Sequence, residues 1–216
     1  AVTEKTGLIF ICNPNNPTGT IVHQDEVIRF LSRLPKRILV VFDEAYGEYV
    51  ADPTYPVAAR LLHRGFPVIF LRTFSKIYGL AGVRIGYGIG DPDLVQILNR
   101  MRQPFNVNLL AQQAALAALS DETHLKRSIA QNEKGMQYLY RQFDAMGIDY
   151  VRTEANFVYF TLKGARTAKK VNEALLRMGV IIRPLEENHL RVSIGSPSEL
   201  KRFIRSLQEI LGSGNK

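Results

Sequence analysis

The sequence contains no tryptophan and only one cysteine, Cys12, among its 216 residues. A lone thiol cannot form an internal disulfide, which excludes the disulfide-stabilised secreted scaffolds. No run of about 18 apolar residues occurs, so we expect no membrane-spanning helix. The first residues, from Ala1 to Thr6, lack the apolar stretch of a secretory signal peptide. Together these absences predict a protein of the reducing cytoplasm.

Charge and histidine content narrow the function classes further. The chain carries 28 Lys and Arg against 20 Asp and Glu, a net charge of +8. The basic residues form no continuous tract, so we expect no nucleic-acid partner, although a positive balance suits ligands that carry phosphate. No two histidines have metal-ligand spacing, and we expect no metal site and no Ser/His/Asp triad. The histidines are His23, His63, His124 and His189.

The N-terminal half alternates short apolar runs with helical segments. Residues 8–12, 38–42 and 67–71 are apolar throughout and lead into polar or turn-forming residues, which is typical of buried parallel strands. The apolar spacing over 24–34 predicts a helix that a proline ends. A glycine-rich run over 84–89 predicts one more strand, whose direction the pattern leaves open. This alternation predicts an α/β fold with a mixed, mostly parallel sheet.

From about residue 92 the sequence becomes helical, and its last third is α+β. Ser196 and Pro197 have the composition of a helix N-cap and first turn. We expect a domain boundary near residue 125, which divides the chain into residues 1–125 and a smaller α+β domain of residues 126–216. The predicted elements are helices over 92–101, 108–119, 121–146, 166–178 and 197–211, and strands over 156–162, 180–182 and 190–194.

Polar residues follow each of the first three predicted strands. An Asn/Pro/Gly-rich loop over 13–19 follows the first, an acidic pair at Asp43 and Glu44 follows the second, and a Ser-Lys pair at Ser75 and Lys76 follows the third. Ligands of open α/β sheets bind beyond the carboxyl ends of the strands. Each feature alone is ordinary, because such loops are usually turns, acidic pairs often cap helices and lysines are usually solvated. Their joint occurrence predicts that they converge on one crevice.

These segments resemble the fold-type I aminotransferases that depend on pyridoxal-5′-phosphate (PLP), and among them the histidinol-phosphate aminotransferases most of all. The resemblance covers essentially the whole chain, and its most specific part is the Ser-Lys…Arg-Ile-Gly block. The motifs that carry it are Asn16-Pro17-Thr18-Gly19, Asp43-Glu44-Ala45-Tyr46 and the block from Thr73 through Lys76 and Arg84 to Tyr87.

The resemblance implies roles for residues of the cofactor site. Lys76 matches the lysine that holds the cofactor and afterwards moves the proton. Asp43 matches the carboxylate that faces the pyridine nitrogen, and Asn16 and Tyr46 match the donors to the ring's phenolic oxygen. The cofactor phosphate would be held by hydroxyls and a guanidinium, groups that form charge-assisted hydrogen bonds; the matching residues are Thr73, Ser75 and Arg84.

The resemblance also implies a substrate site and an assembly. Arg191 matches the arginine that binds the substrate carboxylate in aminotransferases, and Arg183 is the second cation; in a histidinol-phosphate aminotransferase the two would hold the substrate phosphate. Residues 1–125 would be part of the PLP-binding large domain of the transferase fold, and 126–216 its small domain. The expected reaction is transamination between L-histidinol phosphate and 2-oxoglutarate in histidine biosynthesis, by a homodimer.

Other functions remain open at this point. A relative acting on aromatic or other amino acids would carry the same cofactor motifs. A phosphothreonine decarboxylase-like lyase shares these motifs and needs a phosphate pocket as well. A non-catalytic domain that senses PLP in a transcription regulator would need a separate DNA-binding module, and the retention of every catalytic position argues against it.

The chain is shorter than the complete aminotransferases that it resembles. The family's upstream region supplies a Gly/Ser-rich turn for the cofactor phosphate, an aromatic ring that stacks on the pyridine, and tyrosines that reach the substrate. No segment matches these. We therefore expect a C-terminal fragment of a longer enzyme, which binds PLP weakly.

Overall fold

The computed structural model describes residues 1–163 and 167–212, which form two compact units. The N-terminal unit contains residues 1–15 and 21–126, and the C-terminal unit contains residues 16–20 and those from 127 onward. The boundary between 126 and 127 falls inside the long helix α5 (Glu122–Met146). Within the described residues, no helix has both the length and the apolar character needed to cross a membrane.

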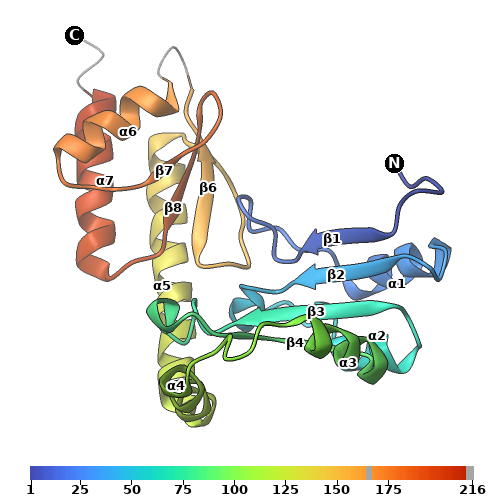
Figure 1. Ribbon diagram of the computed structural model, residues 1–216. Helices are drawn as coiled ribbons and strands as arrows, with labels where there is room; N and C mark the ends of the chain where they lie inside the picture. The colour runs from blue at the N-terminus through green and yellow to red at the C-terminus, as the bar shows by residue number, and fades with distance from the viewer. Residues whose placement is uncertain (164–166, 213–216) are drawn as a thin grey trace. The chain divides into compact units, whose positions relative to one another are not determined.

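The N-terminal unit is built on one four-stranded sheet (Figure 1). The first three strands run parallel and the fourth pairs antiparallel with the third. This confirms the mixed, mostly parallel sheet predicted from the apolar runs. In spatial order, the strands are β1 (Leu8–Cys12), β2 (Leu39–Asp43), β3 (Val68–Thr73) and β4 (Gly86–Gly90).

Apolar side chains of the central strands pack against two helices, α1 (Gln24–Arg33) and α2 (Ala58–His63). Phe42 of β2 and Phe70 of β3 are fully buried, and their rings stack with centroids 5.1 Å apart. Such stacking adds to the apolar burial that stabilises the sheet. The same unit contains α3 (Pro92–Met101), α4 (Leu109–Ser120) and the 3₁₀ turns Gly47–Tyr49 and Ala81–Val83.

The prediction that the first apolar run is fully buried was wrong. In β1, Leu8 is 46% and Phe10 67% exposed, whereas Ile9 and Ile11 pack on the core. Leu8 and Phe10 are exposed because β1 is the edge strand of the sheet. Within the described residues, only one face of this strand packs against the core. A uniformly apolar run cannot by itself distinguish a central strand from an edge strand.

The C-terminal unit contains a second, antiparallel sheet in the order β5-β6-β8-β7. The predicted strand over 180–182 was wrong, since the ladder there contains only the next two residues, and the three-residue β5 was not predicted at all. The helix predicted over 166–178 begins at 168, and residue 166 lies outside the described residues. The elements are β5 (Asp149–Val151), β6 (Phe157–Thr161), α6 (Ala168–Arg177), β7 (Arg183–Pro184), β8 (His189–Ser193) and α7 (Pro197–Gly212).

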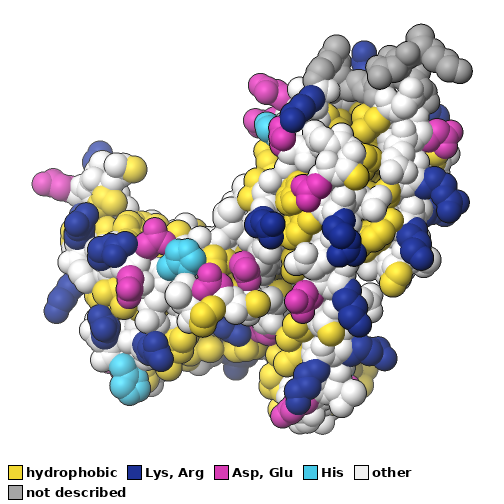
Figure 2. All heavy atoms as spheres, turned by 180° about the vertical axis from the view of Figure 1, so that it is seen from behind, with side chains coloured by type: hydrophobic (Ala, Val, Ile, Leu, Met, Phe, Trp, Pro, Cys, Tyr) yellow, Lys and Arg dark blue, Asp and Glu magenta, His cyan; other side chains and the backbone are white. Residues whose placement is uncertain are grey.

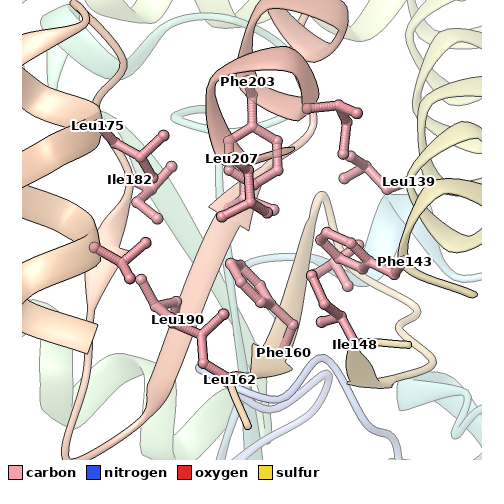
Figure 3. Packing of buried hydrophobic residues seen from close by; sticks show 14 of the residues in the cluster. Leu139, Phe143, Ile148, Phe160, Leu162, Leu175, Ile182, Leu190, Phe203 and Leu207 are labelled. Carbon is pink, nitrogen blue, oxygen red and sulfur yellow. The ribbon is translucent and has the colours of Figure 1, made fainter. Parts of the chain in front are cut away.

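One core holds this unit together (Figure 3). Phe143 of α5 and Phe160 of β6 are fully buried with ring centroids 4.9 Å apart, and Phe203 of α7 completes an aromatic cluster. Val180 and Ile182 are also buried in this core, which explains their apolar character without a strand. The core therefore joins α5, α6 and α7 to the sheet.

The start of α7 confirms the predicted cap at Ser196. The Ser196 hydroxyl accepts a hydrogen bond from the Glu199 amide at 3.4 Å, and the Glu199 carboxylate accepts one from the Ser196 amide at 2.7 Å. The Ser196 hydroxyl also donates to the same carboxylate at 2.7 Å. This reciprocal arrangement is a capping box.

Ser196→Ala is expected to destabilise the C-terminal unit by about 1 kcal/mol, because the start of α7 loses its cap. The hydrogen bonds from Ser196 lower the pKa of Glu199 below its ordinary value of 4.5. A lowered folded-state pKa stabilises above the unfolded value and ceases to do so as the pH falls through the folded one. Urea unfolding at pH 7 and pH 3 should therefore give a smaller difference between parent and variant at pH 3. An equal difference at both pH values would contradict the Ser196–Glu199 contribution.

Charges are interspersed on the surface. Figure 2 shows Lys and Arg side chains separated by Asp, Glu and apolar groups on the visible face, with no continuous basic patch there. The i, i+4 pair of Glu122 and Lys126, at 2.8 Å, is one such local pairing on α5. Such exposed pairs contribute little stability.

Candidate active site

The carboxyl ends of the three parallel strands lie at one edge of the sheet of the N-terminal unit. Cys12 pairs in register with Asp43, and Asp43 pairs with Leu71. The backbone continues the pairing past the strand ends, since the Asn13 amide donates to the Asp43 carbonyl at 3.0 Å and the Glu44 amide to the Leu71 carbonyl at 2.9 Å. The residues that follow β1, β2 and β3 are thereby brought side by side.

Asn13 forms a turn, as expected for this loop. The residue is only 1% exposed, and its side chain donates to the Val22 carbonyl at 3.1 Å and accepts from the Val22 amide at 3.0 Å. The Tyr55 hydroxyl donates to the Asn13 carbonyl. The asparagine thus satisfies buried backbone groups of its own loop and ties the end of β1 in place.

Lys76 and Tyr46 approach each other at this edge. The Lys76 Nζ atom lies 5.4 Å from the centroid of the Tyr46 ring, a cation–π distance. Tyr46 is buried and the lysine is exposed. The neighbouring Asp43 is half-buried and accepts a hydrogen bond from the Ala45 amide at 3.1 Å, which orients its carboxylate at the end of β2. A primary amine and a carboxylate therefore follow adjacent strands.

The loop that carries Lys76 is held from two sides. Its own turn is closed by the Gly79 amide, which donates to the Lys76 carbonyl at 3.0 Å. A ring nitrogen of His124, at the start of α5, lies 2.9 Å from the Ile77 carbonyl. His124 therefore contacts the backbone of the loop that carries Lys76.

Thr73, Ser75 and Arg84 gather beside this loop. The Thr73 hydroxyl accepts from the Ser75 amide at 3.0 Å, and Arg84 Nη1 lies 3.5 Å from the Ser75 hydroxyl and donates to the Ala81 carbonyl at 2.7 Å. Arg84 adopts a left-handed backbone with φ 57°. This brings two hydroxyls and a guanidinium into one small region, and such a set can hold a phosphate group.

The Asn16–Gly19 segment belongs to the C-terminal unit. The Gly19 carbonyl accepts from the Glu154 amide at 2.8 Å. Gly19 has φ 74°, and a Cβ there would lie 1.8 Å from the Thr153 hydroxyl oxygen, so both the backbone and the space require glycine. The loop that follows β1 is therefore divided between the two units, and the convergence of all three strand-end features on one crevice stays a prediction.

Within the C-terminal unit, Asn16 is brought to Arg191. Arg191 Nη1 donates to the Asn16 side-chain oxygen at 2.7 Å, and the Arg191 guanidinium lies 4.7 Å from the centroid of the Phe157 ring. Arg183 of β7 is the direct cross-strand partner of Arg191 in β8. Directly opposed residues point to the same face of a sheet, so the two predicted substrate cations share a face.

Sequence reasoning missed a buried ionic cluster behind these loops, formed by Glu44, Glu48 and Arg72. Arg72 Nε and Nη2 lie 2.8 and 2.7 Å from one Glu44 oxygen, and Arg72 Nη1 lies 3.2 Å from Glu48. The one available signal was an arginine directly after the apolar run of β3 and before Thr73. Such a residue was indistinguishable from a surface arginine until the fold placed both glutamates around it.

The structure gives little support for a cysteine nucleophile or for a metal site. Burial, and then the nearby Asp43 carboxylate, raise the pKa of the Cys12 thiol, which disfavours a thiolate nucleophile. Within residues 1–163 and 167–212, no three His, Cys, Asp or Glu side chains cluster so as to hold a metal ion.

Comparison with known proteins shows the family of the chain. The family model "Aminotransferase class I and II" matches residues 1–207. The chain is 50% identical over 216 residues to the histidinol-phosphate aminotransferase of Moorella thermoacetica, covering 98% of this chain and 55% of that protein. It is 50% identical over 215 residues to histidinol-phosphate aminotransferase 1 of Nitrosococcus oceani, covering 98% and 58%.

A solved structure of an aminotransferase has a closely similar fold. The histidinol-phosphate aminotransferase of Sinorhizobium meliloti, in complex with pyridoxal-5′-phosphate, superposes with a TM-score of 0.89 at 31% identity, covering 97% of this chain and 58% of that one. The chain thus spans a little over half the length of the curated relatives that it matches. Because the family model matches nearly the whole chain, the protein belongs to the class I and II aminotransferases.

Proposed function

We propose that this protein is a PLP-dependent aminotransferase that exchanges an amino group between L-histidinol phosphate and 2-oxoglutarate. The observation that carries the proposal is the approach of Lys76 to Tyr46, next to Asp43, at the carboxyl edge of a parallel sheet. The relatives that share half of its residues are named histidinol-phosphate aminotransferases, which supports the choice of substrate.

The residues of the N-terminal unit fit the cofactor. Thr73, Ser75 and Arg84 offer two hydroxyls and a cation: the Thr73 hydroxyl accepts from the Ser75 amide, and Arg84 lies 3.5 Å from the Ser75 hydroxyl. Such groups form charge-assisted hydrogen bonds with a phosphate ester. Lys76 is exposed, so its amine is accessible to the cofactor aldehyde. When bound, PLP supplies a ring that accepts the electron pair released at the substrate carbon.

The remaining chemistry is done by side chains of the chain. We propose that Asp43 holds the proton on the pyridine nitrogen, and that Tyr46 and Asn16 donate hydrogen bonds to the phenolic oxygen. Lys76 Nζ would then take the proton from the substrate carbon as a general base and, as a general acid, deliver it to the cofactor carbon. No step of this scheme requires a metal ion.

Arg183 and Arg191 would bind the substrate phosphate. They are cross-strand partners on one sheet face, so two guanidinium groups can meet one dianion. The Asn16 side-chain oxygen already orients Arg191, at 2.7 Å. This contact also links the proposed cofactor residue Asn16 to the proposed substrate residue.

We further infer that residues 1–125 correspond to the PLP-binding large domain and 126–216 to the small domain, in a cytoplasmic homodimer. The two compact units support this division, with residues 16–20 grouped with the small domain. Membership of the aminotransferase family supports an amino donor and a 2-oxo acid as substrates.

The proposed substrate is tested by comparing candidate donors in parallel. Glutamate formation from 2-oxoglutarate should be fastest with L-histidinol phosphate and slower with L-phenylalanine. Arg191→Lys should raise KM for histidinol phosphate about 10- to 100-fold, because a bidentate charged contact is lost. Arg177→Lys, at the exposed end of α6, is the matched control and should leave KM unchanged.

Two outcomes would redirect the assignment. Release of carbon dioxide from L-threonine O-3-phosphate, with no 2-oxo acid consumed, would replace the transferase with a lyase. A faster reaction with phenylalanine than with histidinol phosphate would keep the family but discard the phosphate-bearing substrate.

A further inference from the structure

Glu44, Glu48 and Arg72 form a charged cluster next to the proposed cofactor residues, and the proposed reaction assigns no role to it. The Glu44 side chain is 1% exposed, that of Glu48 9% and that of Arg72 24%. The Arg72 guanidinium contacts both carboxylates, with two nitrogens within 2.8 Å of one Glu44 oxygen and a third 3.2 Å from Glu48. Two acids and one arginine are thus held together with little access to water.

Burial of such a cluster carries an energetic cost. Burial raises the pKa of Glu44, and the neighbouring Arg72 opposes that rise. For Arg72, burial lowers the pKa but the two carboxylates outweigh this and raise it, so the guanidinium stays charged. Apolar side chains of similar volume are often at least as stable as a buried ionic triad. Unlike apolar side chains, the charged groups hold one another in fixed directions through their hydrogen bonds.

The cluster joins the two loops that carry the proposed cofactor residues. Glu44 directly follows Asp43, and Glu48 lies two residues beyond Tyr46, so the carboxylates flank the loop from β2. Arg72 lies in β3 directly before Thr73, the last residue of the strand, and the loop that follows leads to Lys76. A single guanidinium therefore connects the loop of Asp43 and Tyr46 with the loop of Lys76.

The surrounding packing leaves the cluster little freedom. A Cβ at Gly47 would lie 3.4 Å from Arg72 Nη2, so the loop backbone passes directly over the guanidinium. Tyr55 and Tyr87 lie close enough to interact electrostatically with Arg72 and the glutamates, and burial raises the pKa of both hydroxyls. The groups that face Arg72 are thus the two carboxylates and these two tyrosine hydroxyls.

We infer that Arg72 is a positioning residue which, through Glu44 and Glu48, fixes Tyr46 and Asp43 against Lys76. It acts through these neighbours and touches neither cofactor nor substrate. The inference deepens the proposed function and rests on it for its catalytic consequence. The geometric part, the position of Lys76 against the Tyr46 ring, belongs to the chain itself and can be measured without cofactor.

The first measurement is an NMR spectrum of the protein with ¹³C-methylated lysines. A methyl group above an aromatic ring is displaced upfield, so Lys76 should give an upfield signal that is absent in Lys76→Arg and returns to the normal lysine position in Tyr46→Leu. Arg72→Met should move it to the normal position as well. Arg60→Met, an exposed arginine of α2, is the matched control and should leave it in place.

The outcomes of this measurement are decisive for the geometry. A folded Arg72→Met protein with an unmoved Lys76 signal overturns the inference. So does a parent signal that Tyr46→Leu does not change. If Arg72→Met does not fold, Glu48→Ala takes its place, since it removes only the 3.2 Å contact with Arg72. A partial move of the signal is then expected, and no move overturns the inference.

The second measurement tests the catalytic consequence. With PLP added, the pH midpoint of the Lys76-dependent near-visible absorbance band should shift by about half a pH unit or more in Arg72→Lys, because the groups around the lysine amine move. An unchanged midpoint overturns the positioning role. A parent protein that gives no lysine-dependent band contradicts the proposed function instead, while the NMR result still decides the position of Lys76.

Discussion

Lys76→Ala is expected to abolish the near-visible absorbance band that the protein forms with PLP, and to lower transamination by about 10²- to 10⁴-fold, the range for loss of a general acid–base group. The amine of Lys76 is the proposed attachment point for the cofactor and the proposed carrier of the proton. Its removal therefore eliminates two roles at once. A titration of PLP into parent and variant, followed by absorbance and then by glutamate production, measures both effects.

The fold should be unaffected by this change. Lys76 is exposed, and surface substitutions usually alter stability by less than about 0.5 kcal/mol. Lys5→Ala, an exposed lysine near the N-terminus, is the matched control and should retain the band. If Lys76→Ala kept a band as strong as that of the parent, another lysine would hold the cofactor and the proposed site would be wrong.

Phe143→Ala is expected to destabilise the C-terminal unit by about 3–5 kcal/mol, the usual cost of removing a buried aromatic ring. Phe143 is fully buried, and its ring contacts those of Phe160, Tyr150 and Phe203 at 4.9, 5.9 and 6.4 Å between centroids. The substitution leaves a cavity at the junction of α5, β6 and α7. Because domains are stable by only about 5–15 kcal/mol, this loss is large enough to shift the unfolding transition markedly.

Urea unfolding followed by circular dichroism measures this loss as a lower midpoint. The control is Ile181→Ala in the same unit, where the side chain is 83% exposed and the expected change is below about 0.5 kcal/mol. Similar midpoints for Phe143→Ala and Ile181→Ala would contradict the core seen in Figure 3.

Much of the fold was predictable because its signals are local. The apolar runs of β2 and β3 lie within five residues each, and their alternation with amphipathic helices leaves few topologies other than a parallel sheet. The cap at Ser196 was readable for the same reason, since Ser196 and Glu199 lie three residues apart. The prediction failed for two short strands, at β5 and at residues 180–182. Strand formation there depends on pairing with a neighbouring strand, which the periodicity of so few residues does not indicate.

The candidate site also has features that the sequence suggested and features that only the fold shows. Asp43, Lys76 and Arg84 could be proposed in advance because Asp43 ends the apolar run of β2, and Lys76 and Arg84 lie in one contiguous motif after β3. The exposure of Phe10 could not, since it depends on which strand occupies the sheet edge. The buried triad of Arg72 could not either, because charged residues are normally solvated and only the fold excludes water from them.

The sequence by itself determined the elements of the N-terminal sheet and the family, because hydrophobic periodicity and motif residues act over short distances along the chain. The roles that it suggests for the strand-end residues stay predictions. Only the tertiary structure decided which distant residues meet. Arg191 reaches Asn16 across 175 positions, and Arg72 reaches Glu44 across 28. Such contacts depend on how whole elements pack, and the free energy of that packing is shared among many side chains rather than encoded in any one segment.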